Sequence, residues 1–336
     1  MSRLESMPLV TLYLTDRCNS RCVTCDYWRH GRDNLTLESL RRMLPELAAR
    51  GTRVALLSGG EPLLNREWRE IASALREQDI RLWLLTSGLS LVKHAPDAAR
   101  LFDSITVSLD GTTRATYQAI RGLDAFDNVC AGIRAAAAAG VRVGVRVTVQ
   151  QTNYQELPRF VTLARELGAY QVSFLAVDVS NPHAFGRSTA FADNLALKLE
   201  DVDGLAALLD SMENEFAADF ASGFIAENPR KLRRLHAYFA ALRGAGEFPA
   251  VRCNAPEFSA VIGVDGRASP CFFIPGPAQP GAAFDLATAL DSEAMRELRG
   301  DIRAGRRPEC ERCVCSLWRD PGELGDARLL LGVRHA

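Results

Sequence analysis

The sequence has no long apolar run and no excess of charge of one sign. None of its hydrophobic stretches approaches the length of a membrane span, and the first ten residues, MSRLESMPLV, lack the apolar core of a signal peptide. Forty basic and 41 acidic residues leave a net charge of -1, which argues against a broad electrostatic surface for nucleic acid. We therefore expect a cytoplasmic protein that engages neither membranes nor nucleic acid.

Internal repeats are also missing, and the one low-complexity tract is the alanine run at 135–140, which is typical of a helix and its C-cap. The composition, 47% apolar and 24% charged, excludes a disordered or fibrous chain. A length of 336 residues suits two average domains, or one large α/β barrel with an appendage.

Short apolar runs alternate with amphipathic segments through the first half of the chain. The six runs are rich in β-branched residues and predict strands at 10–14, 54–58, 82–86, 105–109, 141–149 and 171–177. Repeated strand–helix alternation indicates a parallel sheet with right-handed crossovers. Six units are too few to close an eight-stranded barrel, so the prediction is a partial (β/α)6 TIM-like barrel with ligands at the carboxyl ends of its strands.

The rest of the chain reads differently. Residues 1–178 would form the barrel, and residues 179–250, which are helical and carry no strand signal, would form an insertion or linker. In residues 251–320 we expect a small extension with a β-hairpin around Val264–Gly266 and a helix near 292–304. Residues 321–336 form a tail with no clear pattern.

Cysteine is the residue that is present in an unusual pattern. The count is nine, and an odd number without an export signal argues against a disulfide framework. Cys18, Cys22 and Cys25 follow the first predicted strand and therefore lie at the edge where ligands bind. Thiolates so closely spaced suit zinc or an iron–sulfur cluster. Cys130 is read as a core residue, and the histidines show no ligand spacing: His30, His94, His183, His236 and His335.

A second motif, Gly59-Gly60-Glu61, follows the second predicted strand at the same edge. With the C-x3-C-x2-C motif in register, residues 9–176 resemble the radical S-adenosylmethionine (SAM) superfamily. The resemblance implies that Cys18, Cys22 and Cys25 hold three irons of a [4Fe–4S] cluster. The fourth iron would bind the amine and carboxylate of SAM, and the Gly-Gly-Glu motif would bind the methionine amine. Members of the superfamily often have a bulky residue directly before the third cysteine, whereas this chain has Thr24. Tyr27 or Trp28 would therefore supply the apolar wall of the site.

Other SAM contacts are implied by weaker matches. Ser87 ends the third predicted strand. Ser108 and Asp110 belong to a Ser-Leu-Asp-Gly signature at the end of the fourth predicted strand. Because they are two positions apart, their side chains are predicted to lie on the same side of that strand. Arg121 is a candidate to pair with a carboxylate, and Arg146 on the fifth strand is a second candidate.

The C-terminal cysteines form a second set. Cys253 and Cys271 enclose Gly266 in a C-x12-G-x4-C hairpin, and a distant C-x2-C follows, which resembles the "twitch" extension, a shortened SPASM domain. The resemblance implies an auxiliary [4Fe–4S] cluster on Cys253, Cys271, Cys310 and Cys313. Cys315 is surplus and is an alternative to Cys313, and a zinc ribbon stays open as a different reading.

These patterns predict an enzyme that reductively cleaves SAM to a 5′-deoxyadenosyl radical and then oxidises a substrate in a dehydrogenase-type step. Peptide-modifying, decarboxylating or epimerising chemistry are alternatives. A runner-up among enzymes is an ordinary SAM methyltransferase, and the alternative of another class is a zinc-binding module without activity. Because the first strand starts near residue 9 and leaves no room for a leader-peptide domain, a small metabolite is favoured over a peptide. An external one-electron reductase, of flavodoxin or ferredoxin type, would be the partner.

Overall fold

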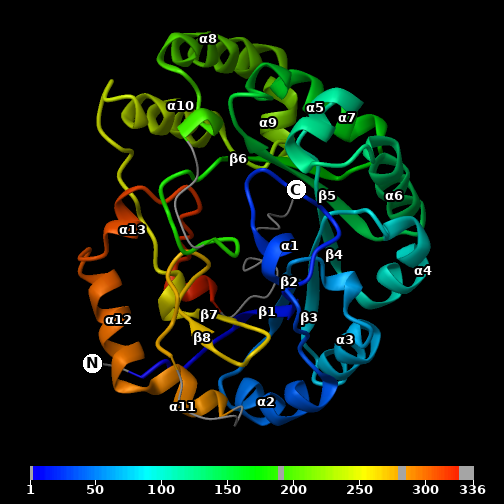
Figure 1. Ribbon diagram of the computed structural model, residues 1–336, viewed down its shortest axis with the longest axis vertical. Coiled ribbons are helices and arrows are strands. Elements are labelled where there is room, and N and C mark those ends of the chain that lie inside the picture. The colour runs from blue at the N-terminus through cyan, green and yellow to red at the C-terminus, as the bar shows by residue number, and fades with distance from the viewer. Residues whose placement is uncertain (1–2, 188–192, 279–284, 325–336) are drawn as a thin grey trace.

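The computed structural model describes residues 3–187, 193–278 and 285–324. His335 and the tail after residue 324 therefore lie outside the described residues. One open sheet runs through the molecule in the order β6-β5-β4-β3-β2-β1-β7-β8 (Figure 1). Its strands are β1 (Leu9–Thr15), β2 (Val54–Gly59), β3 (Arg81–Thr86), β4 (Ser104–Ser108), β5 (Arg142–Val149), β6 (Gln171–Ala176), β7 (Ser259–Ile262) and β8 (Ala268–Ser269).

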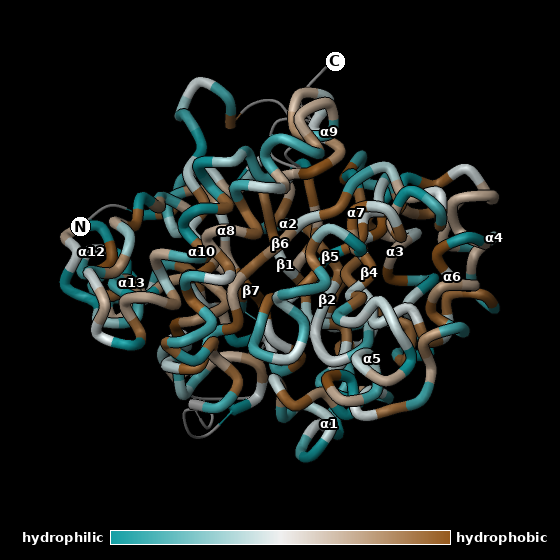
Figure 2. Tube along the Cα trace, turned by 90° about the horizontal axis from the view of Figure 1, so that it is seen from above, coloured by the Kyte–Doolittle hydropathy of each residue, from teal (hydrophilic) through white to brown (hydrophobic). Residues whose placement is uncertain are grey.

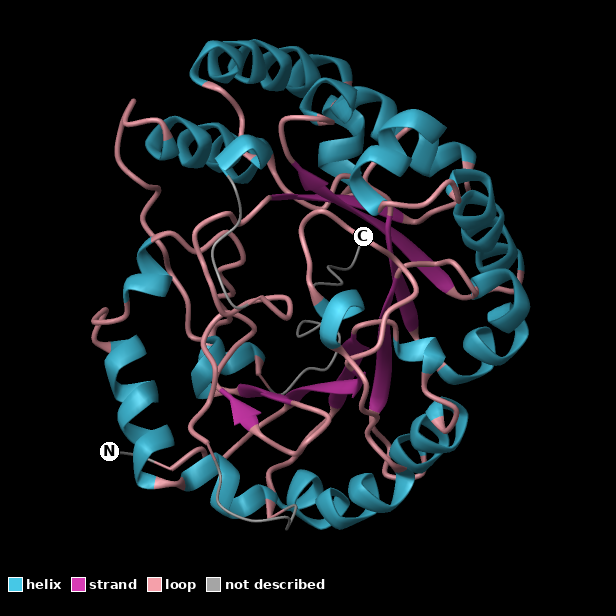
Figure 3. Ribbon diagram, viewed as in Figure 1, coloured by secondary structure: helices cyan, strands magenta, loops and turns pink. Residues whose placement is uncertain are grey.

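The six strands predicted from the apolar runs are confirmed, and β1 to β6 are all parallel. Helices line the outer side of the curved sheet, as Figure 3 shows in cyan around the magenta strands. Those of the barrel are α2 (Leu37–Ala49), α3 (Trp68–Arg76), α4 (Leu91–Leu101), α5 (Arg114–Arg121), α6 (Phe126–Ala138) and α7 (Leu157–Glu166). The partial α/β barrel is thus the observed architecture.

Alternate strand residues explain the two faces of the sheet. On β5 the valines at 143, 145, 147 and 149 are buried in the main hydrophobic core with the outer helices. The intervening residues face the inner, concave side, because successive side chains of a strand point to opposite faces. Figure 2 shows hydrophobic colour along the central strands and hydrophilic colour in much of the surrounding loops.

Local signals in the sequence explain how the first long helix begins. Thr36 Oγ1 accepts a hydrogen bond from the backbone N–H of Ser39 at 3.1 Å and so caps α2. Leu40, Met43 and Leu47 form its buried face. Pro45 lies within the helix, which continues to Ala49.

The predicted C-terminal hairpin is present in the structure, and it extends the sheet of the barrel. Strand β7 pairs in parallel with β1, from Leu9 with Ser259 to Leu12 with Ile262, and β8 pairs antiparallel with β7. A small apolar cluster of Val54, Ala255 and Phe258 packs beside it. This pairing attaches the region that carries the second cysteine set directly to the strand that precedes the first set.

The remaining helices are distributed between the two ends of the sheet. Residues 179–250 contain α8 (Leu199–Glu215), α9 (Ala217–Ser222) and α10 (Pro229–Leu242), and Ile225 forms an isolated parallel bridge with Val172 of β6. Beyond the hairpin lie α11 (Leu286–Asp291), α12 (Glu293–Arg303) and α13 (Pro308–Glu311). None of the helices in the described part of the chain is long and apolar enough to cross a membrane.

Candidate active site

The first three cysteines lie in the loop between β1 and the short helix α1 (Tyr27–His30). Backbone hydrogen bonds pin this cysteine loop (residues 16–26) onto the end of α5, because the N–H groups of Arg21 and Val23 donate to the carbonyls of Arg121 and Ile120, each at 3.0 Å. Gly122 caps α5 with a φ of 72°, and a Cβ at that position would overlap the carbonyl oxygen of Arg21. The close approach therefore requires a glycine.

The Gly-Gly-Glu segment supports the same loop from the other side. The N–H of Gly60 donates to the Thr15 carbonyl at 2.7 Å, and that of Glu61 donates to the Arg17 carbonyl at 2.8 Å. Gly59 has a φ of 123°, and a Cβ on Gly60 would overlap the Arg17 carbonyl. In this structure the two glycines thus let the end of β2 approach the cysteine loop.

The carboxylate of Glu61 is fully buried and accepts four hydrogen bonds within the protein. Its donors are the N–H of Leu63, the hydroxyl of Thr86, and the N–H and hydroxyl of Ser87, at 2.6–3.2 Å. The Ser87 hydroxyl also lies 3.5 Å from Oδ1 of Asn19, within the cysteine loop. Glu61 therefore orders the end of β3 beneath the loop.

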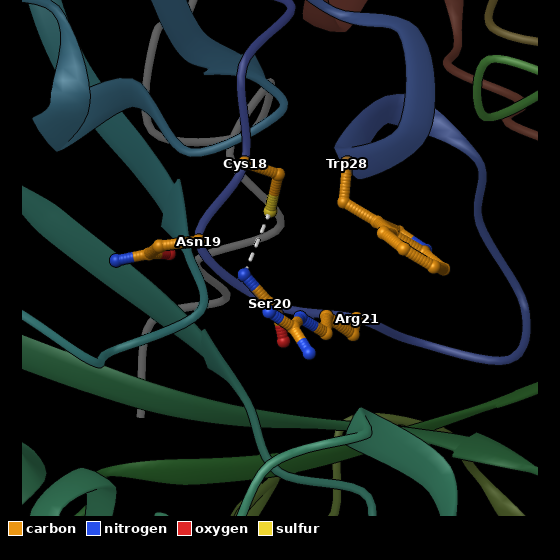
Figure 4. A pocket seen from close by; sticks show the side chains of 5 residues that line it. All are labelled: Cys18, Asn19, Ser20, Arg21 and Trp28. Carbon is orange, nitrogen blue, oxygen red and sulfur yellow. Dashed lines mark hydrogen bonds between the residues drawn. The ribbon is translucent and has the colours of Figure 1, made fainter.

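A polar pocket of about 380 Å³ opens beside Cys18 (Figure 4) and is lined by Cys18, Asn19, Ser20, Arg21 and Trp28. The Cys18 sulfur points towards the N–H of Ser20, which donates to it at 3.4 Å, and the Trp28 ring lies across from it. Trp28 Nε1 donates to the Cys22 carbonyl at 3.3 Å. Of the two aromatic residues considered from the sequence, Trp28 lines this pocket, whereas Tyr27 packs edge-on against Tyr13 of β1.

The thiols of the loop are shielded from water. Burial raises the pKa of Cys18 to about 11 and that of Cys25 to about 12. The Cys25 thiol donates to the carbonyl of Phe185 at 3.3 Å, so the segment after β6 covers it. Thiols in such surroundings lose their protons only against a bound cation, and iron is such a cation.

Asp110 and Arg121 form a buried ion pair at 3.1 Å. Asp110 lies just beyond β4, where its carboxylate also accepts the N–H of Thr148 at 2.7 Å, so it does not share a strand face with Ser108 as the spacing predicted. Burial lowers the pKa of Arg121, but the neighbouring Cys22 and Asp110 outweigh it and raise the pKa overall. Arg121 Nε is buried and has no hydrogen-bond partner among the described residues.

These features fit the groups that the sequence implied. Three shielded thiols in one short loop are the donor set of an iron–sulfur cluster. The orphaned Nε of Arg121 offers a donor for an anionic oxygen, such as the carboxylate of SAM, beside Cys22 and Cys18.

The second cysteine set gathers around the hairpin and α13. Burial raises the pKa of Cys271 to about 12, and Cys310 and Cys253 act on it in the same direction. The pKa of Cys313 is raised by burial and by Cys315, Cys253 and Cys271. Cys253 is therefore a neighbour of Cys271, Cys310 and Cys313.

Cys315 has different surroundings. Burial raises its pKa, whereas Arg146 of β5 and Lys231 of α10 lower it. Two thiols of the second set are also its neighbours: Cys253 raises the pKa of Cys315, and Cys315 raises the pKa of Cys313. Cys315 therefore lies between the second cysteine set and the two cations Arg146 and Lys231.

No three Cys, His, Asp or Glu side chains converge on a point that would hold a single metal ion, among the residues that the structure describes. A cubane cluster differs in its requirement, because each thiolate binds a separate iron and the thiols surround the cluster without meeting at one point.

Tyr13 lies between the two sets. It is on the inner face of β1, it hydrogen-bonds to Tyr27, and its ring lies 6.4 Å from that of Phe272, next to Cys271. Burial raises its pKa well above the usual value, and Tyr27, Cys25 and Cys271 contribute to the rise. One side chain therefore has a cysteine of each set as a neighbour.

A family model described as the radical SAM superfamily matches residues 12–164. This segment contains the end of β1, the cysteine loop, the Gly-Gly-Glu motif and the strands β2 to β5. The matched segment, a little under half of the chain, is similar to the radical SAM superfamily.

Curated relatives match about half of the chain. An Fe-coproporphyrin III synthase of Methanosarcina barkeri is 30% identical over 48% of this chain and 42% of its own length. An AdoMet-dependent heme synthase of the same organism is 32% identical over 50% of each chain. A probable GTP 3′,8-cyclase of Saccharolobus islandicus is 32% identical over 48% of this chain and 54% of its own. The chain spans about half the length of these radical SAM relatives.

Solved structures share the fold over more of the chain. The enzyme anSMEcpe with bound AdoMet has a TM-score of 0.66 at 18% identity, and the likeness covers 91% of this chain and 87% of that one. Streptococcus suis SuiB bound to S-adenosylmethionine has a TM-score of 0.64 at 16% identity, covering 93% and 73%. At this identity the likeness shows the fold alone, and it extends well beyond residues 12–164.

Several residues of the candidate site were not singled out from the sequence. Thr86, which binds Glu61, directly precedes Ser87 and could have been found from the strand end. Tyr13 could have been placed by counting inward-facing positions of β1. Phe185, which covers Cys25 from 160 residues away, left no signal in the sequence.

Proposed function

We propose that this protein is a radical SAM enzyme that carries out a two-electron, dehydrogenase-type oxidation of a small metabolite with the help of a second iron–sulfur cluster. The single observation that carries the proposal is the position of Tyr13, whose side chain neighbours Cys25 of the first set and Cys271 of the second. Two cofactors held by these sets would face the same inner side of the sheet, and a substrate there would be within reach of both.

In this proposal Cys18, Cys22 and Cys25 hold the cluster that binds SAM, with Gly59, Gly60, Glu61, Ser87, Ser108, Asp110 and Arg121 around it. When bound, the cluster supplies one electron to the sulfonium of SAM, which releases a 5′-deoxyadenosyl radical that removes a hydrogen atom from the substrate. Trp28 closes one wall of the pocket beside Cys18 and helps to exclude water. Arg121, fixed by Asp110, presents its Nε to the carboxylate of SAM.

Cys253, Cys271, Cys310 and Cys313 would hold the auxiliary [4Fe–4S] cluster. When bound, it supplies an acceptor for the second electron, so that the substrate loses one hydrogen atom to the radical, then one electron to this cluster and one proton to a base. Burial of these thiols and the proximity of Cys253 to the other three support this set. Cys315 also neighbours Cys253 and Cys313, but it is left out because the cations Arg146 and Lys231 act on it more strongly than any thiol does.

The curated relatives support a small-molecule substrate, because the names that they carry refer to a coproporphyrin, a heme and GTP. Peptide modification is the second candidate, since the fold is also that of SuiB, which has been crystallised with its precursor peptide. The electron for SAM cleavage would come from an external flavodoxin or ferredoxin, and such a partner supports a cytoplasmic location.

The test is anaerobic reconstitution followed by reduction with dithionite in the presence of SAM. We expect 5′-deoxyadenosine as the product and about eight irons per chain. Replacement of Cys18, Cys22 and Cys25 together by alanine is expected to abolish this product and to leave about four irons. S-adenosylhomocysteine as the only product would contradict radical chemistry, and an iron-free triple variant would contradict the auxiliary site.

The triple variant also separates the two candidate last ligands. In this background Cys315→Ser is expected to keep the remaining irons and their electron paramagnetic resonance signal, whereas Cys313→Ser loses both. The opposite result would exchange the roles of these two cysteines, which lie two positions apart on the same segment.

A further inference from the structure

A polar row crosses three neighbouring strands on the inner face of the barrel. Ser108 at the end of β4 pairs in register with Arg146 of β5, and Arg146 pairs with Ser173 of β6. The flanking valines of β5 point the other way, into the helix-packed core. The Arg146 guanidinium therefore lies on the side where the two cysteine sets face each other.

Arg146 is half-buried and lacks a counter-ion. Its Nε donates to the Ser173 hydroxyl at 3.3 Å, and no carboxylate of the described residues forms an ion pair with it. One acid, Glu227, interacts electrostatically with Arg146 but already has other partners. Glu227 accepts the N–H of Phe174 at 2.9 Å and lies 4.0 Å from Lys231. Two cations thus face one carboxylate, which leaves a positive charge unmatched.

The neighbours of Arg146 distinguish it from Arg121. Arg121 acts on Cys18 and Cys25, whereas Arg146 acts on Cys315 and Glu227. Arg146 therefore lies nearer to the second set than Arg121 does, next to the Ser108 end of the position where SAM would bind. The thiol on which it acts, Cys315, is the one not assigned to the auxiliary cluster.

We propose that Arg146, with Ser108 and Ser173 beside it, anchors an anionic oxygen group of the substrate, a carboxylate or a phosphoryl group, on the inner face of the barrel. The proposal rests on the proposed function and deepens it, because it assigns the substrate a class. A guanidinium is suited to this task, since it remains charged and offers paired N–H donors to both groups. A substrate held there would lie between the two cysteine sets.

The test uses the reconstituted protein with SAM and three probes: glutarate for a carboxylate, inorganic pyrophosphate for a phosphoryl group, and pentane-1,5-diol as a neutral control. Binding is measured by calorimetry and by the shift of the unfolding temperature. We expect one of the anions to bind saturably and the diol not to bind. Arg146→Gln is expected to weaken anion binding by about tenfold or more, and Arg146→Lys, which keeps the charge but loses the paired donors, is expected to retain only part of the affinity.

Arg142→Gln is the matched control. Arg142 lies on the same face of β5, four residues earlier, but it is exposed and stacks over Tyr170 at 4.4 Å. Its replacement should leave anion binding unchanged. The anion that binds identifies the class, glutarate for a carboxylate substrate and pyrophosphate for a phosphorylated one.

Three results would overturn the anchor: neither anion binds the wild type, Arg146→Gln binds as tightly as the wild type, or Arg142→Gln weakens binding equally. A loss of SAM affinity in Arg146→Gln without a loss of anion affinity would instead assign Arg146 to the cofactor. The formation of 5′-deoxyadenosine by the wild type is scored separately. Its absence would refute the proposed function while an Arg146-dependent anion site could still be present.

Discussion

A single buried carboxylate shows how this site is held together. Glu61 follows β2, yet its oxygens accept donors from the end of β3, and its own N–H holds the cysteine loop through Arg17. A buried carboxylate is stable only when its lone pairs are satisfied, and Glu61 has four donors. The side chain therefore serves the site by fixing Ser87 and, through it, the position of Asn19.

Glu61→Ala is the first test of this view. The change leaves the N–H and hydroxyl of Ser87 buried without an acceptor, so we expect the free energy of unfolding to fall by about 3 kcal/mol. Iron should be retained, while SAM binds about tenfold more weakly because the neighbouring loop shifts. Chemical unfolding, iron content and SAM titration measure the three quantities.

Glu70→Ala is the control, since Glu70 is exposed on α3 and should change none of them. Unchanged stability in Glu61→Ala would show that its four hydrogen bonds are not needed to hold this edge of the sheet.

At the residue scale, the sequence was informative where the chemistry is local. The three cysteines and the Gly-Gly-Glu segment are contiguous motifs, so their positions could be read directly. The donors of Glu61 and the carbonyl of Phe185 on Cys25 come from distant segments, and only the folded chain brings them together.

At the scale of elements, the cysteine loop is a platform between the ends of β2 and α5. The strand ends were predictable, because runs of β-branched residues predict buried parallel strands. Helix α5 was missed, since its eight residues, RATYQAIR, bury only Tyr117, Ile120 and Arg121. Its Thr113 cap and its Gly122 terminus were the available signals.

Gly122→Ala tests whether the loop needs α5. A Cβ at this position would overlap the Arg21 carbonyl, and the positive φ adds backbone strain. We expect the variant to lose most of the iron of the first site after reconstitution, measured as iron per chain, because its three thiols no longer share one geometry.

The matched control is Gly51→Ala. Gly51 also ends a helix with a positive φ, of 65°, but nothing lies within 4 Å of a Cβ there. Gly51→Ala should lower the free energy of unfolding by about 1 kcal/mol and leave the iron content unchanged. If both variants lost iron equally, backbone strain alone would explain the loss, and the contact between Gly122 and Arg21 would not be needed.

At the scale of the whole molecule, the C-terminal region is joined to the barrel twice. Strand β7 pairs with β1, and Asp291 at the end of α11 forms ion pairs with Arg50 after α2, at 2.9 Å, and with Arg299 of α12, at 3.2 Å. Asp291 also accepts the N–H of Leu4 at 3.1 Å. These contacts hold the two cysteine sets in one body, which the sequence could not reveal because partners lie up to 287 residues apart.

Asp291→Ala tests the second junction. Its removal leaves the buried Arg299 without a counter-ion among the described residues and leaves the buried Arg50 with Glu46 alone, so we expect the free energy of unfolding to fall by about 3 kcal/mol. Burial raises the pKa of Asp291, but Leu4 N–H, Arg50 and Arg299 outweigh it and lower the pKa overall. The stabilisation by Asp291 is therefore complete above the usual pKa of aspartate and disappears only as the pH falls through the lowered value, so the loss in Asp291→Ala should be constant from about pH 6 to 8.

The control is Glu257→Ala, which breaks an exposed ion pair with Arg303 and should lower the free energy of unfolding by less than about 1 kcal/mol. An equal cost in the two variants would mean that Asp291 contributes no more than a surface charge, and that β7 alone joins the second cysteine set to the barrel.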